Sequence, residues 1–186
     1  MKKYELLIDD TIDVFGVTLF RVKALISFGT VKKGDLGGYV EKEDNLYHSG
    51  NAWVSGNARV YGNARVYGNA WVSGDAEVSG NAEVYGNAEV YGNARVSGNA
   101  WVSGDAEVSG NARVSGDADY IVFKNHWSSG RYFTYTRSNK MWKVGCFFGT
   151  GQELIEKAYQ DSKVSGKYYE ACVKFVEKIE EINNEK

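Results

Sequence analysis

Gly50-Asn51-Ala52-Trp53-Val54-Ser55 is the first of twelve consecutive six-residue repeats that run without interruption to Ile121. Each repeat reads Gly, then Asn or Asp, then Ala, a variable residue, Val, and usually Ser or Tyr. Only the last repeat departs from this pattern, because Tyr120 and Ile121 replace its Val and Ser. A unit this short cannot bury its own apolar side chains, so stability must come from stacking one turn of chain on the next.

The repeat predicts a parallel β-helix whose coil has three flat faces, with one repeat on each face. Val and Ala point inward, and the variable residue and the Ser or Tyr point outward. Gly with Asn or Asp occupies each corner, because these residues tolerate a positive φ. Three repeats of six residues make a coil of 18, so the twelve repeats make about four regular coils. The fold class is therefore mainly β.

Val60-Tyr61-Gly62-Asn63-Ala64-Arg65 resembles the hexapeptide repeat of left-handed β-helix proteins. The resemblance implies a left-handed coil, an exception to the right-handed rule for parallel crossovers, and it implies trimers formed through the flat faces. With Gly34-Asp35-Leu36-Gly37-Gly38-Tyr39-Val40 before the repeats and Gly145-Cys146-Phe147-Phe148-Gly149-Thr150 after them, the whole chain resembles hexapeptide-repeat proteins of bacteria and their prophages. This second resemblance carries no established activity.

The regular middle and irregular ends divide the chain into an N-terminal β cap (residues 1–36), the β-helix (37–121) and a small α/β module (122–186). Cys146 and Cys172 do not make a disulfide framework, and no apolar run near the start reads as a signal peptide or a membrane span. We therefore expect reduced thiols and a cytoplasmic protein.

Residues 4–8 and 17–26 are expected to form strands before the repeats. They would cover the open end of the β-helix, which otherwise exposes unpaired backbone groups and apolar core. Extending the repeat register backward places Val40 and Leu46 at Ala positions and His48 at a Val position. The helix is therefore expected to begin near Gly37.

The C-terminal module is expected to hold a β-hairpin and two helices. Residues 130–137 and 140–148 read as strands around a two-residue loop. A capping-box spacing at Thr150 and Glu153 predicts a helix that runs to about Tyr159, and a second helix is expected after Ser165. Pairing residue 137 with residue 140 puts two pairs on one face of the hairpin, namely Tyr135 with Trp142 and Phe133 with Val144.

The outward positions of the repeats fall into vertical columns when the chain is stacked every 18 residues. Opposite charges within a column favour a fixed register, and exposed aromatic strips usually mark contacts. We expect self-association, with a trimer favoured, and the interface hypothesis names Trp53, Trp71, Tyr67, Tyr85 and Trp101. Surface decoration and a foreign ligand are the alternatives. The columns are Trp53-Trp71-Glu89-Glu107, Arg59-Glu77-Arg95-Arg113 and Arg65-Glu83-Trp101-Asp119.

Acyltransferases are the best-known members of the hexapeptide-repeat family, so the resemblance makes acyl transfer from an acyl-CoA donor the first enzymatic hypothesis. Their chemistry uses a His general base, often beside a loop that interrupts the repeats. Here no loop interrupts the repeats and no His lies within them; His48 and His126 flank them. His126 is the better candidate base, with ordinary polar packing as the alternative. No other catalytic or metal-binding motif is present, and we expect no cofactor or metal.

The segment from residue 120 to residue 152 contains no Asp or Glu, and its basic side chains are interleaved with aromatic ones. Cationic groups hold phosphates and aromatic rings stack on bases, so this pattern is typical of a site for an anionic, planar ligand. The alternative is a structural cap with its aromatic residues buried. The candidate ligand-binding residues are Trp127, Arg131, Tyr132, Thr134, Thr136, Arg137, Lys140, Trp142 and Lys143.

The sequence thus favours a non-catalytic oligomeric binding protein with a C-terminal recognition module. The prophage resemblance implies that the target is a host protein or an anionic nucleotide-like ligand, as for a counter-defence inhibitor or a sequestering protein. Duplex nucleic acid and membranes are not expected as partners. The alternatives are a hexapeptide acyltransferase and a purely structural self-assembling β-helix.

Overall fold

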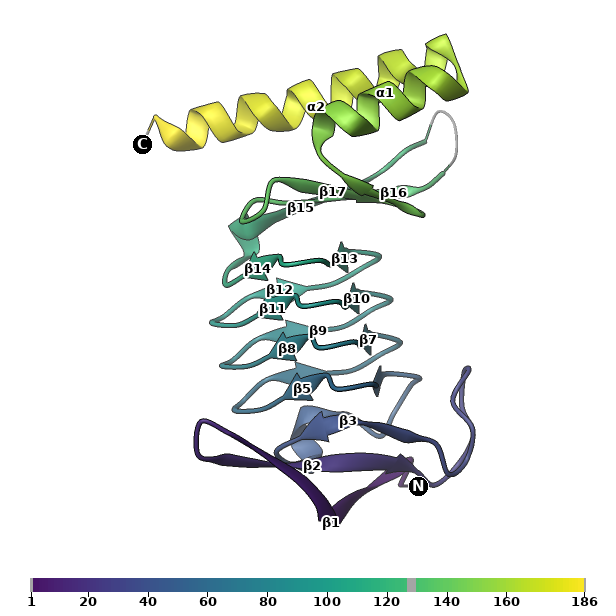
Figure 1. The fold of residues 1–186 in the computed structure, drawn as a ribbon, viewed down its shortest axis with the longest axis vertical. Coiled ribbons are helices and arrows are strands. Elements are labelled where there is room, and N and C mark those ends of the chain that lie inside the picture. Colours follow the sequence, from purple (N-terminus) through teal and green to yellow (C-terminus); the bar gives the residue numbers. More distant parts are fainter. Residues whose placement is uncertain (1, 127–129, 186) are drawn as a thin grey trace.

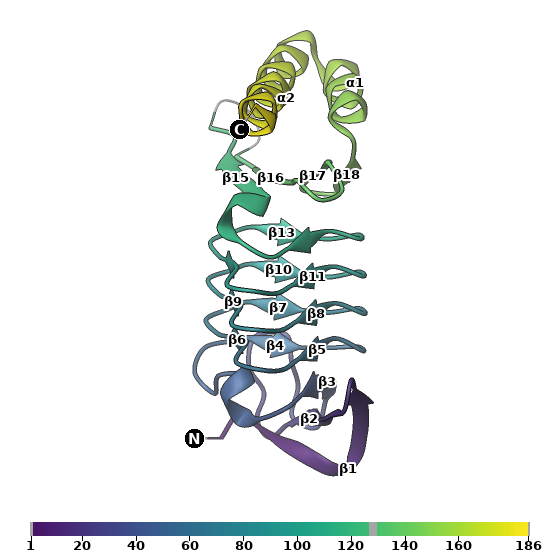
Figure 2. The same cartoon turned by 90° about the vertical axis from the view of Figure 1, so that its left-hand side faces the viewer.

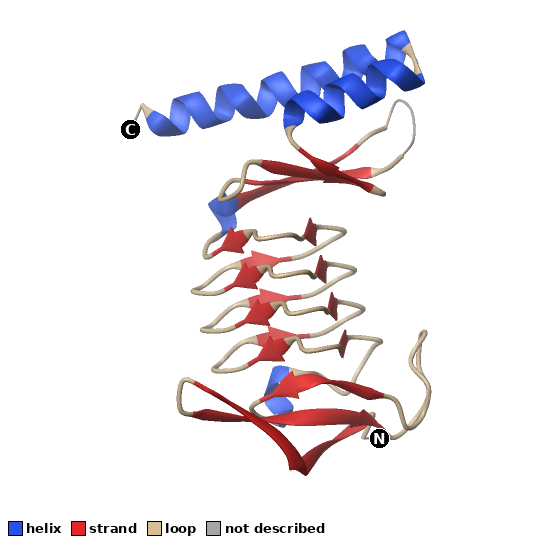
Figure 3. Cartoon of the chain, in the orientation of Figure 1, coloured by secondary structure: helices blue, strands red, loops and turns tan. Residues whose placement is uncertain are grey.

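The computed structural model describes residues 2–126 and 130–185 and shows an elongated molecule built on a stack of parallel coils (Figure 1). A twisted hairpin lies at the N-terminal end of the stack, and a small sheet with two helices lies at the C-terminal end (Figure 3). The chain is a parallel β-solenoid of about four coils. The expected fold class is confirmed, and the left hand of the coil stays an expectation of the resemblance.

Two-residue strands on three faces build the solenoid. The inward Ala and Val side chains of the repeats form one continuous core along its axis. Each coil is bonded to the next by backbone hydrogen bonds, as where Arg59 N donates to Ala76 O at 2.9 Å. The strands are β4 (Trp53–Val54), β5 (Arg59–Val60), β6 (Arg65–Val66), β7 (Trp71–Val72), β8 (Glu77–Val78), β9 (Glu83–Val84), β10 (Glu89–Val90), β11 (Arg95–Val96), β12 (Trp101–Val102), β13 (Glu107–Val108) and β14 (Arg113–Val114).

Glycine is required at the corners of the coils for two reasons. Gly86 has a φ of +72°, a region that side chains other than Gly rarely adopt. A Cβ at this position would lie 2.9 Å from the backbone nitrogen of Gly104 in the next coil. The glycines therefore permit both the sharp turn and the close stacking of successive corners.

The predicted columns form on the three faces, with one exception. Within them, Arg65 and Glu83 approach to 3.8 Å, as expected for an exposed pair that contributes only a few tenths of a kcal/mol. Asp119 does not continue its column, because it lies in the short 3-10 helix η2 (Asp117–Asp119). There its carboxylate accepts hydrogen bonds from the backbone N–H groups of Ser115 and Gly116.

The N-terminal segment extends one face of the solenoid into a seven-stranded sheet. β1 (Tyr4–Val14) and β2 (Val17–Ala24) form an antiparallel hairpin, β2 pairs with β3 (Leu36–Val40), and β3 runs parallel to β5. A 3-10 helix, η1 (Glu43–Asn45), follows. The expected cap is therefore hydrogen-bonded directly to the first coil.

The expected register of the first coil is wrong by two residues. Val40 pairs with Val60 and Leu46 bridges to Val66, so both occupy Val positions instead of Ala positions. The reason is a longer corner, since Leu46 and Val54 are eight residues apart where the repeats allow six. His48 lies in this longer corner and not at a Val position.

The C-terminal module is a four-stranded antiparallel sheet covered by two helices (Figure 2). The expected hairpin register is confirmed, with Tyr135 opposite Trp142 and Phe133 opposite Val144. Two strands were not expected: the end of the last repeat starts the sheet, and a turn at Gly145 separates off a fourth strand. The strands are β15 (Tyr120–Lys124), β16 (Tyr132–Thr136), β17 (Met141–Val144) and β18 (Phe147–Gly149).

The two helices are α1 (Gly151–Asp161) and α2 (Lys163–Asn184). The capping box of α1 is confirmed, because Glu153 N donates to Thr150 Oγ1 and the Glu153 carboxylate accepts from Thr150 N. α2 begins earlier than expected, since the Ser162 side chain caps it. Across the two described ranges, neither helix has the length and apolar character needed to cross a membrane.

Candidate functional site

Both faces of the four-stranded sheet in the C-terminal module are covered, one by the helices and the other by the solenoid. The predicted ligand residues are split between these two faces. Phe133, Tyr135 and Trp142 pack with Val173 and other apolar residues of the helices. Thr134 and Lys143, which alternate with them along the strands, face the last coil of the solenoid. The structure therefore does not bring the predicted residues together into one pocket.

The residues that face the last coil are engaged in contacts within the chain. Thr134 Oγ1 accepts a hydrogen bond from Glu107 N at 3.0 Å, and Lys143 Nζ lies 3.2 Å from the Glu107 carboxylate. Burial acts to lower the pKa of Lys143, but Tyr91 and Glu107 outweigh it and raise the pKa above its usual value. A hydrogen bond to Asp105 likewise raises the pKa of Tyr132. These side chains fasten the module to the solenoid.

A groove of about 710 Å³ lies on the other side of the sheet, between the β16–β17 hairpin and α2. Its floor is apolar and includes the buried Tyr135 and Trp142. Trp142 is only 2% exposed, because its ring is packed into the core of the module. The residues that line the groove and bear on its chemistry are Arg137, Lys140, Val173, Val176, Glu177, Glu180 and Glu181.

The rim of this groove carries both signs of charge. Arg137 Nε donates to both carboxylate oxygens of Glu180, at 2.9 and 3.2 Å, so this cation is already paired. Lys140 is exposed at the turn of the hairpin and has a positive φ of +55°. The acidic rim was not foreseen because its residues follow the hairpin by about forty positions. A signal was present, since the end of α2 is rich in Glu.

The remaining predicted residues lie elsewhere. Arg131 lines a separate hollow of about 340 Å³ together with Tyr132, Asp105 and Glu107. The Thr136 hydroxyl donates to the Asn139 side chain within the hairpin turn. His126 is exposed after β15, and Trp127 lies outside the described residues.

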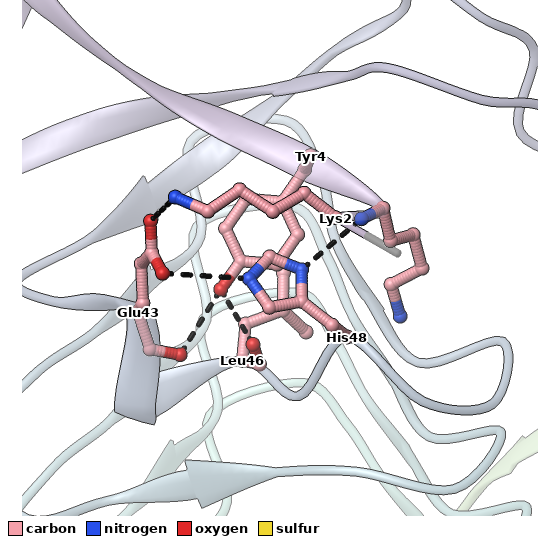
Figure 4. Close-up of polar contacts among 6 residues, drawn as sticks. Lys2, Tyr4, Glu43, Leu46 and His48 are labelled. Atoms are coloured by element: carbon pink, nitrogen blue, oxygen red, sulfur yellow. Dashed lines mark hydrogen bonds and ion pairs between the residues drawn. The ribbon is translucent and has the colours of Figure 1, made fainter.

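His48 takes part in a polar cluster at the N-terminal end of the solenoid (Figure 4). Its ring stacks on Tyr4, with centroids 4.3 Å apart, and its Nδ1 accepts a hydrogen bond from Lys3 N. Its Nε2 lies 3.6 Å from the Glu43 carboxylate. Nδ1 is therefore engaged by the backbone, and Nε2 faces the Glu43 carboxylate beyond hydrogen-bond distance. In the part of the chain that the structure describes, no cluster of His, Cys, Asp and Glu is suited to hold a metal.

Lys3 is the most deeply buried cation in this region, with 2% of the residue exposed. Its Nζ donates to Ala52 O at 2.8 Å and lies 4.7 Å from the centre of the Phe28 ring. Burial lowers the pKa of this ammonium group to about 8. Through these contacts Lys3 covers the open N-terminal end of the solenoid.

At each end of the solenoid, polar groups from neighbouring segments bond to open backbone groups on all three faces. At the N-terminal end, carbonyl oxygens need donors: Lys3 Nζ serves Ala52 O, Tyr39 N serves Ala58 O and Asn45 Nδ2 serves Ala64 O. At the C-terminal end, N–H groups need acceptors: Asp117 serves Trp101 N, Thr134 serves Glu107 N and Ser138 serves Arg113 N. The repeat pattern did not indicate these caps, because five of them lie outside the repeats and Asp117 lies in the irregular last repeat.

The predicted interface residues differ in accessibility. Trp53 is only 2% exposed, because the N-terminal segment covers it with Tyr4 and Phe28. Its assignment to an exposed strip is therefore wrong. Tyr67 and Tyr85 stack with centroids 5.0 Å apart, and Trp101 is 53% exposed. Trp71 is half-buried, and its Nε1 donates to Ser55 Oγ.

A family model described as a YdcK beta-solenoid repeat matches residues 58–74 and 88–104, both within the stacked coils. No curated protein matches the chain. Together with the parallel ladders, the family model identifies a β-solenoid repeat protein.

Proposed function

We propose that the chain is a non-catalytic binding protein, in which the solenoid is a rigid stem and the C-terminal module recognises a segment of a partner protein. The observation that supports this proposal is the groove between the β16–β17 hairpin and α2. It combines an apolar floor with charged groups on its rim, as protein-binding sites commonly do.

The charge distribution favours a protein segment over an anionic nucleotide. Arg137 is neutralised by Glu180, and Glu177 and Glu181 line the same groove. A phosphate placed beside Lys140 would therefore meet carboxylates on the opposite rim. A peptide can instead place an apolar side chain over the floor and present charges of both signs to the rim.

Two further observations bear on the alternatives. An acyltransferase needs a His base beside the donor, and His126, the candidate for that role, is exposed after β15 and does not line the groove. Open-ended assembly of coils needs free ladder groups at the ends, and these groups carry caps on all three faces. A host protein as the target rests on the prophage resemblance alone and is part of the proposal.

The test is affinity purification from bacterial lysate with the full chain and with variants of the groove. Lys140→Glu and Glu177→Lys reverse one charge on each rim, and both positions are exposed. We expect a protein that the wild type retains to fall at least about tenfold with each variant, since each reversal places like charges together. Lys157→Glu, on the exposed side of α1, is the matched control.

Calorimetry with the purified partner then measures the same variants directly. Equal binding by the wild type, both groove variants and the control would refute the groove assignment. A nucleotide-sized mass retained in native mass spectrometry would favour the sequestering alternative. Thermal stabilisation by coenzyme A would reopen the acyltransferase alternative.

A further inference from the structure

The second helix, α2, has an apolar stripe on the side that does not face the sheet. Its buried face is formed by Cys172, Val173 and Val176. Four large apolar residues lie outside this face: Val164, Tyr168, Phe175 and Ile182 are 64%, 41%, 58% and 48% exposed. Exposed apolar side chains that follow one line along a helix usually mark an interaction surface.

The stripe follows the spacing of a coiled-coil seam. Steps of four, three, four, three and four residues connect its positions. This alternation is the a and d pattern by which two helices pack side by side. The positions are Val164, Tyr168, Ala171, Phe175, Lys178 and Ile182.

The first helix, α1, covers a different side of α2. Tyr159 of α1 donates to the Glu170 carboxylate at 2.7 Å, and the hollow between the helices is lined by Glu170 and Glu177. Tyr168 lies two positions before Glu170, and Phe175 lies two positions before Glu177. Residues two positions apart on a helix do not face the same side, so Tyr168 and Phe175 point away from α1. Figure 2 shows α1 beside α2 on one side only.

The charges along α2 identify what fits the stripe. Lys167 flanks its first turns, Lys174 its middle and Glu181 its last turns. A second α2 lying antiparallel places Lys167 beside the partner's Glu181, and the symmetry of the pair repeats this contact. The same arrangement places Lys174 beside the partner's Lys174, but Glu170 of its own helix already pairs with Lys174 at 2.6 Å. In a parallel pair the side of the stripe that carries Lys167 faces the other side of the partner's stripe, so Lys167 does not meet Glu181. Two opposite-charge contacts and one compensated like-charge contact therefore favour the antiparallel direction.

We propose that two copies of the chain associate through this stripe, with their α2 helices antiparallel. In this arrangement each position of the stripe meets one position of the other copy. The contacts are Val164 with Ile182, Tyr168 with Lys178, and Ala171 with Phe175. Glu181 already forms an ion pair with Lys178 of the same helix. Because this pair is exposed, breaking it costs little free energy, and Glu181 can pair with Lys167 of the second copy instead. This surface is distinct from the solenoid faces and from the groove.

Sedimentation equilibrium of the full chain tests the proposal. We expect a concentration-dependent dimer that Phe175→Asp weakens about 100-fold or more, because a carboxylate replaces a ring at the centre of the seam. Phe15→Asp is the matched control, since Phe15 is exposed at the opposite end of the molecule. Thermal unfolding of both variants verifies that they fold.

A charge swap tests the direction of the helices. Lys167→Glu and Glu181→Lys should each weaken the dimer about tenfold, because each places like charges together twice. The double variant restores opposite pairs and should return to within about threefold of the wild type. In a parallel pair neither single change removes a favourable contact, so the absence of this rescue overturns the antiparallel arrangement.

Two other results overturn the proposal as a whole. One is a monomer at every concentration measured, including a monomer that binds a foreign protein through Phe175. The other is an oligomer that tolerates Phe175→Asp but dissociates when Trp101 is replaced, which would assign self-association to the solenoid face. Groove variants such as Lys140→Glu leave the dimer intact, so failure here is distinguishable from failure of the proposed binding function.

Discussion

Lys3 and Thr134 satisfy opposite ends of the same face of the solenoid. Lys3 Nζ donates to Ala52 O below the first strand of this face, and Thr134 Oγ1 accepts from Glu107 N above the last one. Along this face Trp53 N, Trp71 N and Glu89 N each donate to the carbonyl oxygen of an Ala in the next coil. This row of hydrogen bonds would leave Ala52 O without a donor at one end and Glu107 N without an acceptor at the other, and Lys3 and Thr134, both outside the repeats, supply these partners.

We predict that Lys3 makes stability rise with pH. Its pKa is about 8 in the folded chain and near 10.5 when unfolded, so the unfolded state binds more protons between these values. The free energy of unfolding should therefore increase by about 1–2 kcal/mol between pH 8 and pH 10. Denaturant titrations of the wild type and of Lys3→Gln measure this difference. Parallel pH profiles for the two proteins would contradict the prediction.

Tyr4 supports the choice of this window. Burial, with help from Glu43 and Asp44, raises the pKa of Tyr4 above its usual value. Its ionisation in the unfolded state lowers stability only as pH passes about 10. Because both proteins retain Tyr4, subtracting their profiles removes this contribution.

Replacing Thr134 by Val should destabilise the junction between solenoid and module. The change keeps the shape of the side chain but leaves the Glu107 N–H without its acceptor, at a cost of about 1–2 kcal/mol. Thr134→Ser retains the hydroxyl and should cost less than Thr134→Val. Chemical denaturation of the three proteins compares these values; an equal loss in both variants would show that packing, not the cap, is responsible.

The corner glycines should not tolerate a side chain. Gly86→Ala forces a positive φ on Ala and brings its Cβ within 2.9 Å of the Gly104 nitrogen, so we expect a loss of more than about 2 kcal/mol. Gly116→Ala is the control, because Gly116 has a φ of −153° and open space around it. Its melting temperature should stay close to that of the wild type. Similar melting temperatures for the two variants would contradict this account of the corners.

The first hairpin can be stabilised at its turn. Phe15 has a φ of +53°, is 92% exposed and precedes Gly16, whose φ is +83°. Two positive φ values favour Asn-Gly at such a turn, so Phe15→Asn should stabilise the chain by about 1 kcal/mol. Phe15→Ser is equally polar but lacks this backbone preference. A rise in melting temperature for Ser equal to that for Asn would point to solubility instead.

Local periodicity was enough to predict the solenoid and most of its surface columns. Each repeat fixes its neighbours at a constant spacing, so Arg59 pairs with Glu77 as the sequence indicated. The same regularity failed before residue 50, where a longer corner shifts Val40 and Leu46 by two positions. An added pair of residues has no periodic signal.

The candidate site was harder to predict because it depends on contacts between distant segments. Alternation along the hairpin correctly put Tyr135 and Trp142 on one face. It could not show that the opposite face, with Thr134, closes the solenoid. Nor could the basic segment alone show that Glu180, on α2, pairs with Arg137.

The constant 18-residue spacing of the coils makes the stem extensible. Inserting 18 residues adds a complete coil, and the three donors and three acceptors at the ends still meet the faces they met before. Inserting six or twelve residues instead rotates every cap onto the wrong face. The molecule is thus built as a spacer whose length changes in fixed increments of about 4.8 Å, without any redesign of the parts it separates.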